Sequence, residues 1–354
     1  MRAKRRISAR LGDILQRMLG PVETGSRQRL RVKAQRCRPA PLQPRYGLMM
    51  LPQRMRLMLE RNAKRNLPLI YALIGVPFLL YIFIVIVPLC ISIFYSLLKW
   101  DGIGPQSFVG FKNFATMLKD RNFWLSTTNT LIISLYCVLG QVGVALVISF
   151  LMTNRRLKLK EFHRTVIFFP VVLAPVVIGF VWKFVYDQNF GLLNTLLRAL
   201  GLQSWIRLWL DDTSIILTTI SIPVMWQYIG LYLVILMGAI SAVPTEIYEC
   251  AEIDGANWYQ RSMKITLPMI WDTLKIAIIL CASGTMKIYD HIYIMTNGGP
   301  GRSSSVLALY CFKTTFDNSN FGYGATISVM LLVFSLLISW VIQLLMGSYG
   351  RKNA

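Results

Sequence analysis

Charged residues are scarce in this sequence: they make up 15% of its 354 residues, whereas hydrophobic residues make up 55%. Because soluble domains carry about a quarter charged residues, the composition argues against a soluble fold. The sequence contains no GxxxxGK[ST] phosphate loop, and no lysine directly follows a glycine. Histidine occurs only as His163 and His291, so we expect neither a histidine-based metal site nor a catalytic triad.

Cysteine is also sparse, and none of the six cysteines forms a CxxC pair. We therefore expect free thiols that pack as small apolar residues, with no disulfide framework and no bound cofactor.

Long apolar runs dominate the rest of the chain. Six of them reach the roughly 20 residues that a helix needs to cross the hydrocarbon core of a bilayer. Inside lipid the backbone must satisfy its own hydrogen bonds, so these runs are expected to be helices of an all-α polytopic membrane protein. The predicted spans are 69–96, 129–152, 164–186, 215–241, 272–294 and 325–347.

Lys and Arg predict the orientation of these spans. Residues 1–66 hold 18 of the 38 basic residues, and loop 153–164 holds five more. Basic residues stay in the cytoplasm, so both termini and the loop 242–271 are expected on the cytoplasmic side of a bacterial-type cell membrane.

Residues 1–66 carry only three acidic residues and little apolar periodicity. We expect a disordered basic cytoplasmic tail, with adhesion to anionic lipid as one role for its charge. A start of translation at Met55 or Met58 is the alternative interpretation, because either would leave a short basic lead-in to the first span.

Residues 244–268 form a charged, glycine-broken loop between two apolar segments. Pro244 suits the first turn of a helix, and Gly255 can take the left-handed conformation that ends one. Asn257 and Gln260 have the spacing of a capping box, which starts a second helix. Two short helices at an angle would form a rigid knob that suits docking on a partner, although a solvated loop is the simpler interpretation.

The same residues carry a family resemblance. Glu249-Cys250-Ala251, Gly255 after three further residues, and Ile265-x-Leu267-Pro268 after nine more resemble the EAA loop of binding-protein-dependent ABC importer permeases. Two blocks resemble the outer loops of six-span sugar permeases of the maltose and glycerol-3-phosphate type: residues 296–301 with 307–310, and residues 108–114. The resemblance covers roughly residues 67–347. It departs from the usual pattern at Cys250, where alanine is common, and at Tyr259, where tryptophan is common.

The resemblance implies a division of the chain and a set of partners. The expected parts are a tail (1–66), a first span with its outer loop (67–124), a permease core with an EAA loop at 244–268 (125–347), and a cytoplasmic C-terminus (348–354). A cytoplasmic ABC ATPase dimer, a second permease subunit and an extracytoplasmic solute-binding protein are the implied partners, and ATP hydrolysis is expected on the ATPase rather than on this chain. The implied ATPase-coupling residues are Glu249, Ala251, Asp254, Gly255, Ile265, Leu267 and Pro268.

Placing a polar group inside a membrane span costs free energy, and such groups are often functional. The polar residues of the fourth and fifth spans are therefore candidates for a sugar pathway. The candidates are Gln227, Tyr228, Tyr232, Gly284, Thr285, Lys287 and Asp290. In the resembling permeases these segments line the solute site, where apolar Leu231 and Ile288 also fall in register. The alternatives are interfacial anchoring by the aromatics and mutual pairing of Lys287 with Asp290.

Two other functions are compatible with a polytopic membrane protein. An ion-coupled secondary carrier would need acidic or histidine relays deep in the spans. Only Asp290 is available for such a relay, and it lies near one end of its span. A non-transporting membrane scaffold could use the same cytoplasmic knob. The sequence shows no nucleic-acid-binding fold, so nucleic acid is not an expected partner.

Overall fold

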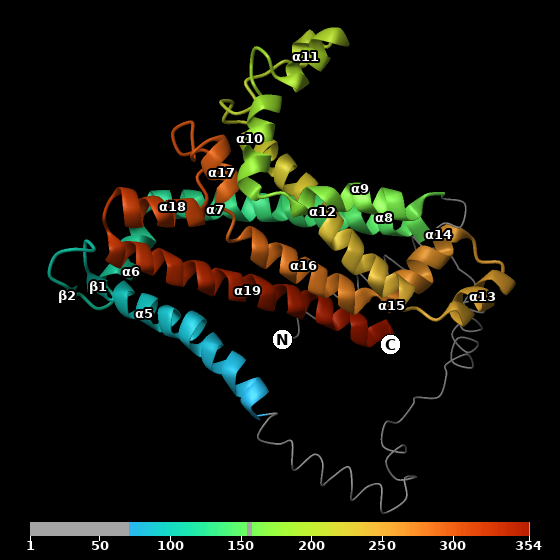
Figure 1. The fold of residues 1–354 in the computed structure, drawn as a ribbon, viewed down its shortest axis with the longest axis horizontal. Helices are drawn as coiled ribbons and strands as arrows, with labels where there is room; N and C mark the ends of the chain where they lie inside the picture. Colours follow the sequence, from blue (N-terminus) through green and yellow to red (C-terminus); the bar gives the residue numbers. More distant parts are fainter. Residues whose placement is uncertain (1–70, 154–157, 354) are drawn as a thin grey trace, which may run out of the picture. The chain divides into compact units, whose positions relative to one another are not determined.

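The computed structural model describes residues 71–153 and 158–353, with side chains as far as residue 347. Predictions made for residues 1–66 therefore lie outside the described part of the chain. Helices make up most of what is described (Figure 1). Four of them are long and apolar enough to cross a membrane: Tyr71–Ser96, Arg121–Thr153, Ile216–Ser241 and Phe321–Gly347.

Two further spans are broken helices. Helices α9 (Lys160–Val172) and α10 (Pro175–Val185) meet at an angle of 99°. The segment Trp258–Met269 meets α16 (Trp271–Thr285) at 72°. Counting each bent pair as one span gives the six spans predicted from composition. Proline explains the first break, because Pro170 and Pro175 flank it and neither offers an amide hydrogen to continue the helix.

Two of the long spans consist of more than one helical element. The Arg121–Thr153 span comprises α7 (Arg121–Cys137), the π-helical turn η2 (Val138–Gly143) and α8 (Val144–Thr153). The first span comprises η1 (Ile82–Ile86) and α5 (Val87–Ser96) after its opening turns. The other long helices are α12 (Ile216–Ser241) and α19 (Phe321–Asn353).

Two predicted span limits were wrong. The second span begins at Arg121 rather than at residue 129, because Asp120 accepts a hydrogen bond from the Asn122 amide and caps a longer helix. The fifth ends at Thr285 rather than at residue 294. Its last turn tightens, with the amides of Lys287 and Ile288 bonding three residues back, and a separate short helix follows, α17 (Asp290–Met295).

The main core surrounds α12, which packs against α9, the Arg121–Thr153 span and α16. Its centre is formed by Ile220, Leu233 and Leu236, all fully buried. Burial of such side chains contributes about 1.5–3 kcal/mol each in water. In lipid, however, helix packing depends more on close contact than on the hydrophobic effect.

Close contact is clearest at Gly230 in α12. A Cβ atom there would lie 2.4 Å from the Ile167 carbonyl oxygen and 2.6 Å from the Phe168 Cα, both backbone atoms of α9. Gly230→Ala should therefore lower the free energy of unfolding by about 1–3 kcal/mol, because the two helices must move apart. Thermal unfolding in detergent would measure this loss.

Gly238→Ala is the matched control on the same helix, because no atom lies within 4 Å of the added Cβ. This variant should unfold at or above the wild-type temperature, since alanine is the better helix former. Wild-type stability of Gly230→Ala would contradict the close-packing interpretation.

A second cluster joins the start of α7 to the chain around Tyr310 and Tyr323. The Asp120 carboxylate accepts hydrogen bonds from the hydroxyls of Tyr310 (2.5 Å) and Tyr323 (2.6 Å). Burial raises the pKa of Asp120, but these bonds and the amides of Asn122 and Phe123 outweigh it, so the net pKa lies below its usual range. Burial and the same carboxylate raise the pKa of Tyr310 to about 12. Asp120 therefore stays ionised and ties three segments together.

Short elements connect the spans. Two strands of two residues each, β1 (Leu98–Lys99) and β2 (Ser107–Phe108), pair in an antiparallel hairpin. The Asn113 side chain donates to the Ser96 and Leu98 carbonyls. The remaining connectors are α6 (Lys112–Lys119), α11 (Leu192–Ala199), η3 (Gln203–Trp205), α13 (Thr245–Ile253), α14 (Trp258–Arg261), η4 (Ser262–Thr266), α15 (Leu267–Met269), α18 (Leu307–Phe312) and η5 (Lys313–Asp317).

Candidate functional site

The segment 244–268, called here the bent segment, folds as its local sequence predicts. Helix α13 ends in a Schellman motif: the Ala256 amide donates to the Ala251 carbonyl, and the Gly255 amide donates to the Glu252 carbonyl. Gly255 has φ +73°, the left-handed conformation that this motif requires. The predicted stop at Gly255 is thus confirmed, and Pro244 stands one position before the helix, as its N-cap.

The second helix of the bent segment starts at the predicted capping box. The Asn257 side chain accepts from the Gln260 amide at 2.8 Å, and the Gln260 side chain accepts from the Asn257 amide at 3.1 Å. Both helix ends are thus fixed by residues no more than five positions apart. For this reason local sequence was sufficient to predict the bend.

Contacts across the bend hold the two helices together. The hydroxyls of Tyr248 in α13 and Thr266 in η4 lie 3.1 Å apart, and the Arg261 guanidinium lies 5.7 Å from the centre of the Tyr248 ring. Tyr248 and Leu267 also pack against the main core. Sequence analysis missed Tyr248, Arg261 and Thr266, because nothing in their spacing indicates that they meet in space.

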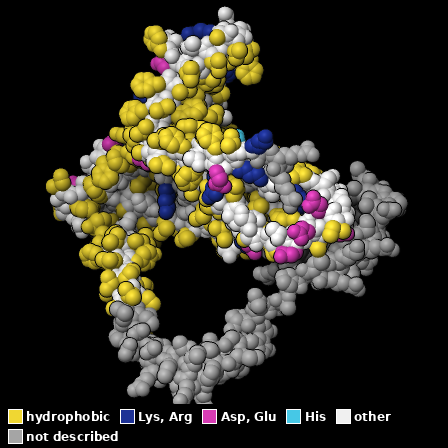
Figure 2. Space-filling model, turned by 45° about the vertical axis from the view of Figure 1, so that its right-hand side comes forward, with side chains coloured by type: hydrophobic (Ala, Val, Ile, Leu, Met, Phe, Trp, Pro, Cys, Tyr) yellow, Lys and Arg dark blue, Asp and Glu magenta, His cyan; other side chains and the backbone are white. Residues whose placement is uncertain are grey.

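One edge of the bent segment is exposed and acidic. Glu246, Glu249 and Glu252, three residues apart on α13, are all exposed, whereas Ala251 on the opposite side is buried. Acidic side chains gather on the right-hand side of Figure 2. Asp254 is also exposed. Ile265 and Leu267 are half-buried, and Pro268 is exposed. The segment therefore presents a negative, rigid edge on a base anchored in the core.

The base of the bent segment leads into α16 beside the end of α19. The Trp271 indole donates to the Met346 carbonyl at 3.1 Å. A movement of the bent segment would therefore also displace the start of α16 and the end of α19.

The predicted solute residues divide into two groups. Gly284, Lys287 and Asp290 are exposed, and Tyr228 is half-buried. Gln227, Tyr232 and Thr285 are buried, and Thr285 donates to the Ser134 hydroxyl of α7 at 2.9 Å. No ion pair joins Lys287 to Asp290, both of which the structure describes. The seven residues therefore do not share one environment: three are exposed, one is half-buried and three are buried.

Gln227 lies instead at the centre of a buried polar contact. Its amide nitrogen donates to the Leu173 carbonyl at 2.8 Å, at the break between α9 and α10. Its amide oxygen lies 2.7 Å from His291 Nε2 in α17, and both side chains are about 2% exposed or less. We term these two residues the Gln227–His291 pair. It joins α12 to the break between α9 and α10 and to α17, the short helix that follows the end of α16.

His291 was absent from the predicted site. It is one of only two histidines, and it fell inside the apolar run predicted to be the fifth span. The rule that polar residues in spans are functional would have selected it. Gln141 also forms a contact between helices: its amide donates to the Val224 carbonyl at 3.1 Å and accepts from the Cys281 thiol at 3.2 Å.

The loop after α17 is fixed to α7. The Asn129 amide donates to the carbonyls of Ser303 and Ser305, each at 2.9 Å, and the Leu307 amide donates to the Thr130 hydroxyl at 2.9 Å. Residues 303–307 are therefore fixed to the middle of α7. No cluster of three His, Cys, Asp or Glu residues suited to a metal ion occurs in the described part of the chain.

Comparison with known proteins identifies relatives of this fold. Residues 141–348 match the family described as "Binding-protein-dependent transport system inner membrane component". The chain is 31% identical to the probable ABC transporter permease protein YurN of Bacillus subtilis, over 82% of this chain and 99% of YurN. It is also 31% identical to the diacetylchitobiose uptake system permease protein NgcF of Streptomyces coelicolor, over 80% of this chain and 84% of NgcF. The trehalose/maltose transport system permease protein MalF of Thermococcus litoralis is 31% identical, over 70% of this chain and 83% of MalF.

A solved structure shares the fold. A chain of a bacterial alginate ABC transporter, in complex with an alginate pentasaccharide-bound periplasmic protein, superposes with a TM-score of 0.70 over 80% of this chain and 95% of that chain. At 17% identity this likeness establishes the fold alone.

Proposed function

Because the chain belongs to the family of inner membrane components of binding-protein-dependent transport systems, we propose that it is the permease subunit of an ATP-driven importer for a sugar or oligosaccharide. The bent segment is the observation that carries this proposal. Its two short helices, locked by a Schellman motif and a capping box, form a rigid exposed knob at the start of a span.

The knob supports coupling to a separate ATPase. We assign Glu249, Asp254 and Gly255 to the docking edge, and the half-buried Ile265 and Leu267 to its base. The chain itself lacks a phosphate loop, so a cytoplasmic ABC ATPase dimer would supply the energy. Closure of that dimer would push the knob, and the Trp271–Met346 hydrogen bond would pass the movement to α16 and α19 together.

The other partners follow from the same assignment. A second permease would complete the pathway, and an extracytoplasmic binding protein would deliver the solute, as the periplasmic protein in the alginate transporter complex suggests. Both termini and the knob would lie in the cytoplasm, in keeping with the excess of basic residues on that side.

A carbohydrate is the solute class that the relatives favour. NgcF is named for diacetylchitobiose and MalF for trehalose and maltose. On this chain, the exposed Gly284, Lys287 and Asp290 are the members of the predicted set open to solute, together with the half-buried Tyr228. Aromatic faces and polar groups of this kind can bind sugar rings and hydroxyls.

Co-purification of the solubilised chain from its host tests the proposal. We expect a stoichiometric ATPase and a second permease to remain bound, and the reconstituted assembly to import a labelled sugar only when ATP is present on the knob side. A chain that purifies alone, or uptake that follows an ion gradient without ATP, would instead favour a secondary carrier or a scaffold.

A further inference from the structure

Helix α13, which carries the acidic edge, is attached to the rest of the protein at few places. Its two ends continue into α12 and into the bend at Gly255. Among the described elements, none has a backbone that packs closely along α13. The bend itself is open, because a Cβ atom at Gly255 would meet no atom within 4 Å. A force on α13 would therefore turn the helix about its ends unless a side chain links it to the body of the protein.

Tyr248 supplies such a link. It lies three residues before the buried Ala251, on the inner side of α13, and its side chain packs against the main core. Its hydroxyl lies 3.1 Å from the hydroxyl of Thr266, the last residue of η4. Thr266 is 3% exposed and donates its only hydroxyl proton to the Arg261 carbonyl at 3.2 Å. The Tyr248 hydroxyl is therefore the donor to Thr266.

Arg261, the last residue of α14, completes the set of contacts. Its guanidinium lies 5.7 Å from the centre of the Tyr248 ring, close enough for a cation to be attracted to an aromatic face. Tyr248, Thr266 and Arg261 therefore contact one another in a closed ring of three, which we call the brace. The brace joins α13 to the far side of the bend.

The brace reaches the chain at an irregular turn. In the π-helical turn η4 the hydrogen bonds run five residues back, as the bond from the Leu267 amide to the Ser262 carbonyl shows. Single π-helical turns inside helices occur frequently at functional sites. The Thr266 hydroxyl also reaches five residues back, to the Arg261 carbonyl. The Thr266 side chain therefore supports the register of η4 as well as the contact with α13.

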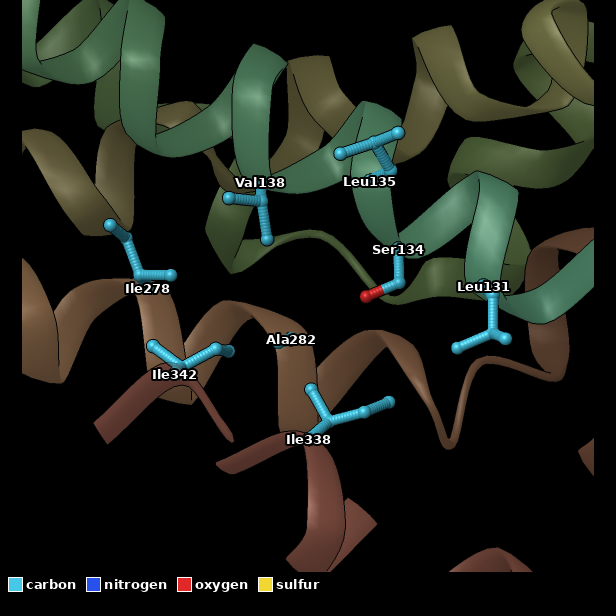
Figure 3. A pocket seen from close by; sticks show the side chains of 8 residues that line it. All are labelled: Leu131, Ser134, Leu135, Val138, Ile278, Ala282, Ile338 and Ile342. Carbon is cyan, nitrogen blue, oxygen red and sulfur yellow. The ribbon is translucent and has the colours of Figure 1, made fainter. Parts of the chain in front are cut away.

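The backbone of Thr266 is joined in turn to α16. Its carbonyl accepts from the Ile270 amide at 3.0 Å, and Ile270, 2% exposed, is the N-cap of α16. Helix α16 packs on both α7 and α19. Figure 3 shows Ala282 of α16 lining a pocket together with Ser134 of α7 and Ile338 of α19. A displacement of Thr266 would therefore reach three membrane spans.

We propose that the brace makes α13 and α16 move as one body, so that a movement at the docking edge becomes a movement of the membrane spans. Tyr248 and Thr266 are positioning residues in this role, because they act through α16. The inference rests on the proposed coupling to an ATPase, and it adds the residues through which the movement passes. Loss of the brace should leave the docking edge in place but let α13 move without α16.

Variants that lack one hydroxyl test the proposal. Tyr248→Phe and Thr266→Val each remove one hydroxyl and keep nearly the same shape. Thr266→Ser is the matched control, because it keeps the hydroxyl. Spin labels are attached at Thr245→Cys in α13 and Ile276→Cys in α16, both exposed positions, in a chain whose native cysteines have been replaced. The distance between the labels is then measured in the assembled transporter with and without ATP.

ATP should not change this distance in the wild type or in Thr266→Ser, because α13 and α16 move together. In Tyr248→Phe and in Thr266→Val the distance should shift or broaden when ATP is added. The double variant should behave like either single variant, because both substitutions remove the same hydrogen bond. The brace is overturned if ATP changes the wild-type distance, or if the two hydroxyl-deletion variants keep the wild-type pattern.

Co-purification separates this proposal from the function on which it rests. Both hydroxyl-deletion variants should keep the ATPase bound, since neither substitution alters the acidic edge. A variant that loses the ATPase would show that these hydroxyls shape the docking surface, which overturns the brace and leaves the proposed function intact. A wild-type assembly that holds no ATPase would overturn the proposed function, and the brace with it.

Discussion

Replacement of Glu249 by lysine should abolish most solute uptake while the protein still inserts and assembles in the membrane. Glu249 is exposed on the acidic edge of α13 and supports no described hydrogen bond or ion pair, so its loss should leave the fold intact. A partner that binds this edge is expected to be positive, and a lysine would place like charges opposite each other. Such a reversal costs several kcal/mol at an interface.

The size of the effect follows from that cost. A loss of about 3 kcal/mol corresponds to roughly a 100-fold weaker interaction, so uptake should fall to a few per cent of the wild-type rate. Uptake of a labelled sugar into vesicles, alongside ATP hydrolysis by the same preparation, measures the coupling. We expect uptake to fall together with the stimulation of ATP hydrolysis by solute.

Glu161→Lys is the matched control. Glu161 is an exposed glutamate in the first turn of α9, outside the bent segment, and within the described part of the chain it pairs with Arg164 at 3.6 Å. Exposed pairs of this kind contribute about 0–1 kcal/mol, so this variant should transport normally. If Glu249→Lys imports solute at the wild-type rate, the assignment of α13 to the ATPase interface is wrong.

The bend of the bent segment was predictable because its causes are local. The end of the first helix requires a residue with positive φ, which favours glycine at position 255. The start of the second helix is stabilised by the reciprocal hydrogen bonds of a capping box, which Asn257 and Gln260 form. Each of these interactions spans only a few residues, so the residue types that it requires can be recognised in the sequence. The six spans were predictable for a similar reason, since each depends only on the length of an apolar run.

The solute face was not predictable in the same way. Gly284 and Thr285 are neighbours in the sequence, yet the first is exposed and the second is buried against α7. Which side of α16 faces inward is decided by α7 and α19, both distant in sequence. The predicted fifth span ran past Thr285 because the apolar Ile288, Ile292 and Ile294 follow it, although Lys287, Asp290 and His291 interrupt the run there.

Replacement of Gln227 by leucine should destabilise the protein even when no solute is present. Both ends of the Gln227 amide are already used, by the Leu173 carbonyl and by His291. Leucine has nearly the same volume but would leave these two buried groups without their partner. Hydrogen bonds between membrane helices contribute on average about 0.6 kcal/mol and at most about 1.7, so a loss of about 1–2 kcal/mol in the free energy of unfolding is expected.

A double-mutant cycle with His291→Leu isolates the pair. Because Gln227 and His291 bond to each other, the double variant should lose less stability than the two single losses combined, with a coupling energy of about 0.5–1.5 kcal/mol. Gln141→Leu is the matched control: it is a buried glutamine of another span, bonded to Val224 and Cys281 but not to His291. Its effect should add to that of His291→Leu within about 0.5 kcal/mol.

Transport kinetics then distinguish a positioning role from direct solute contact. The Gln227–His291 pair fixes α12 to the break between α9 and α10 and to α17. Its loss should therefore lower the maximal uptake rate, by roughly 10-fold for each 1.4 kcal/mol of lost positioning. The solute concentration at half-maximal uptake should change little. A contact with solute would give the reverse pattern, with a higher half-saturation concentration and unchanged stability of the solute-free protein. That result would restore Gln227 to the solute pathway and remove the pair from the mechanism.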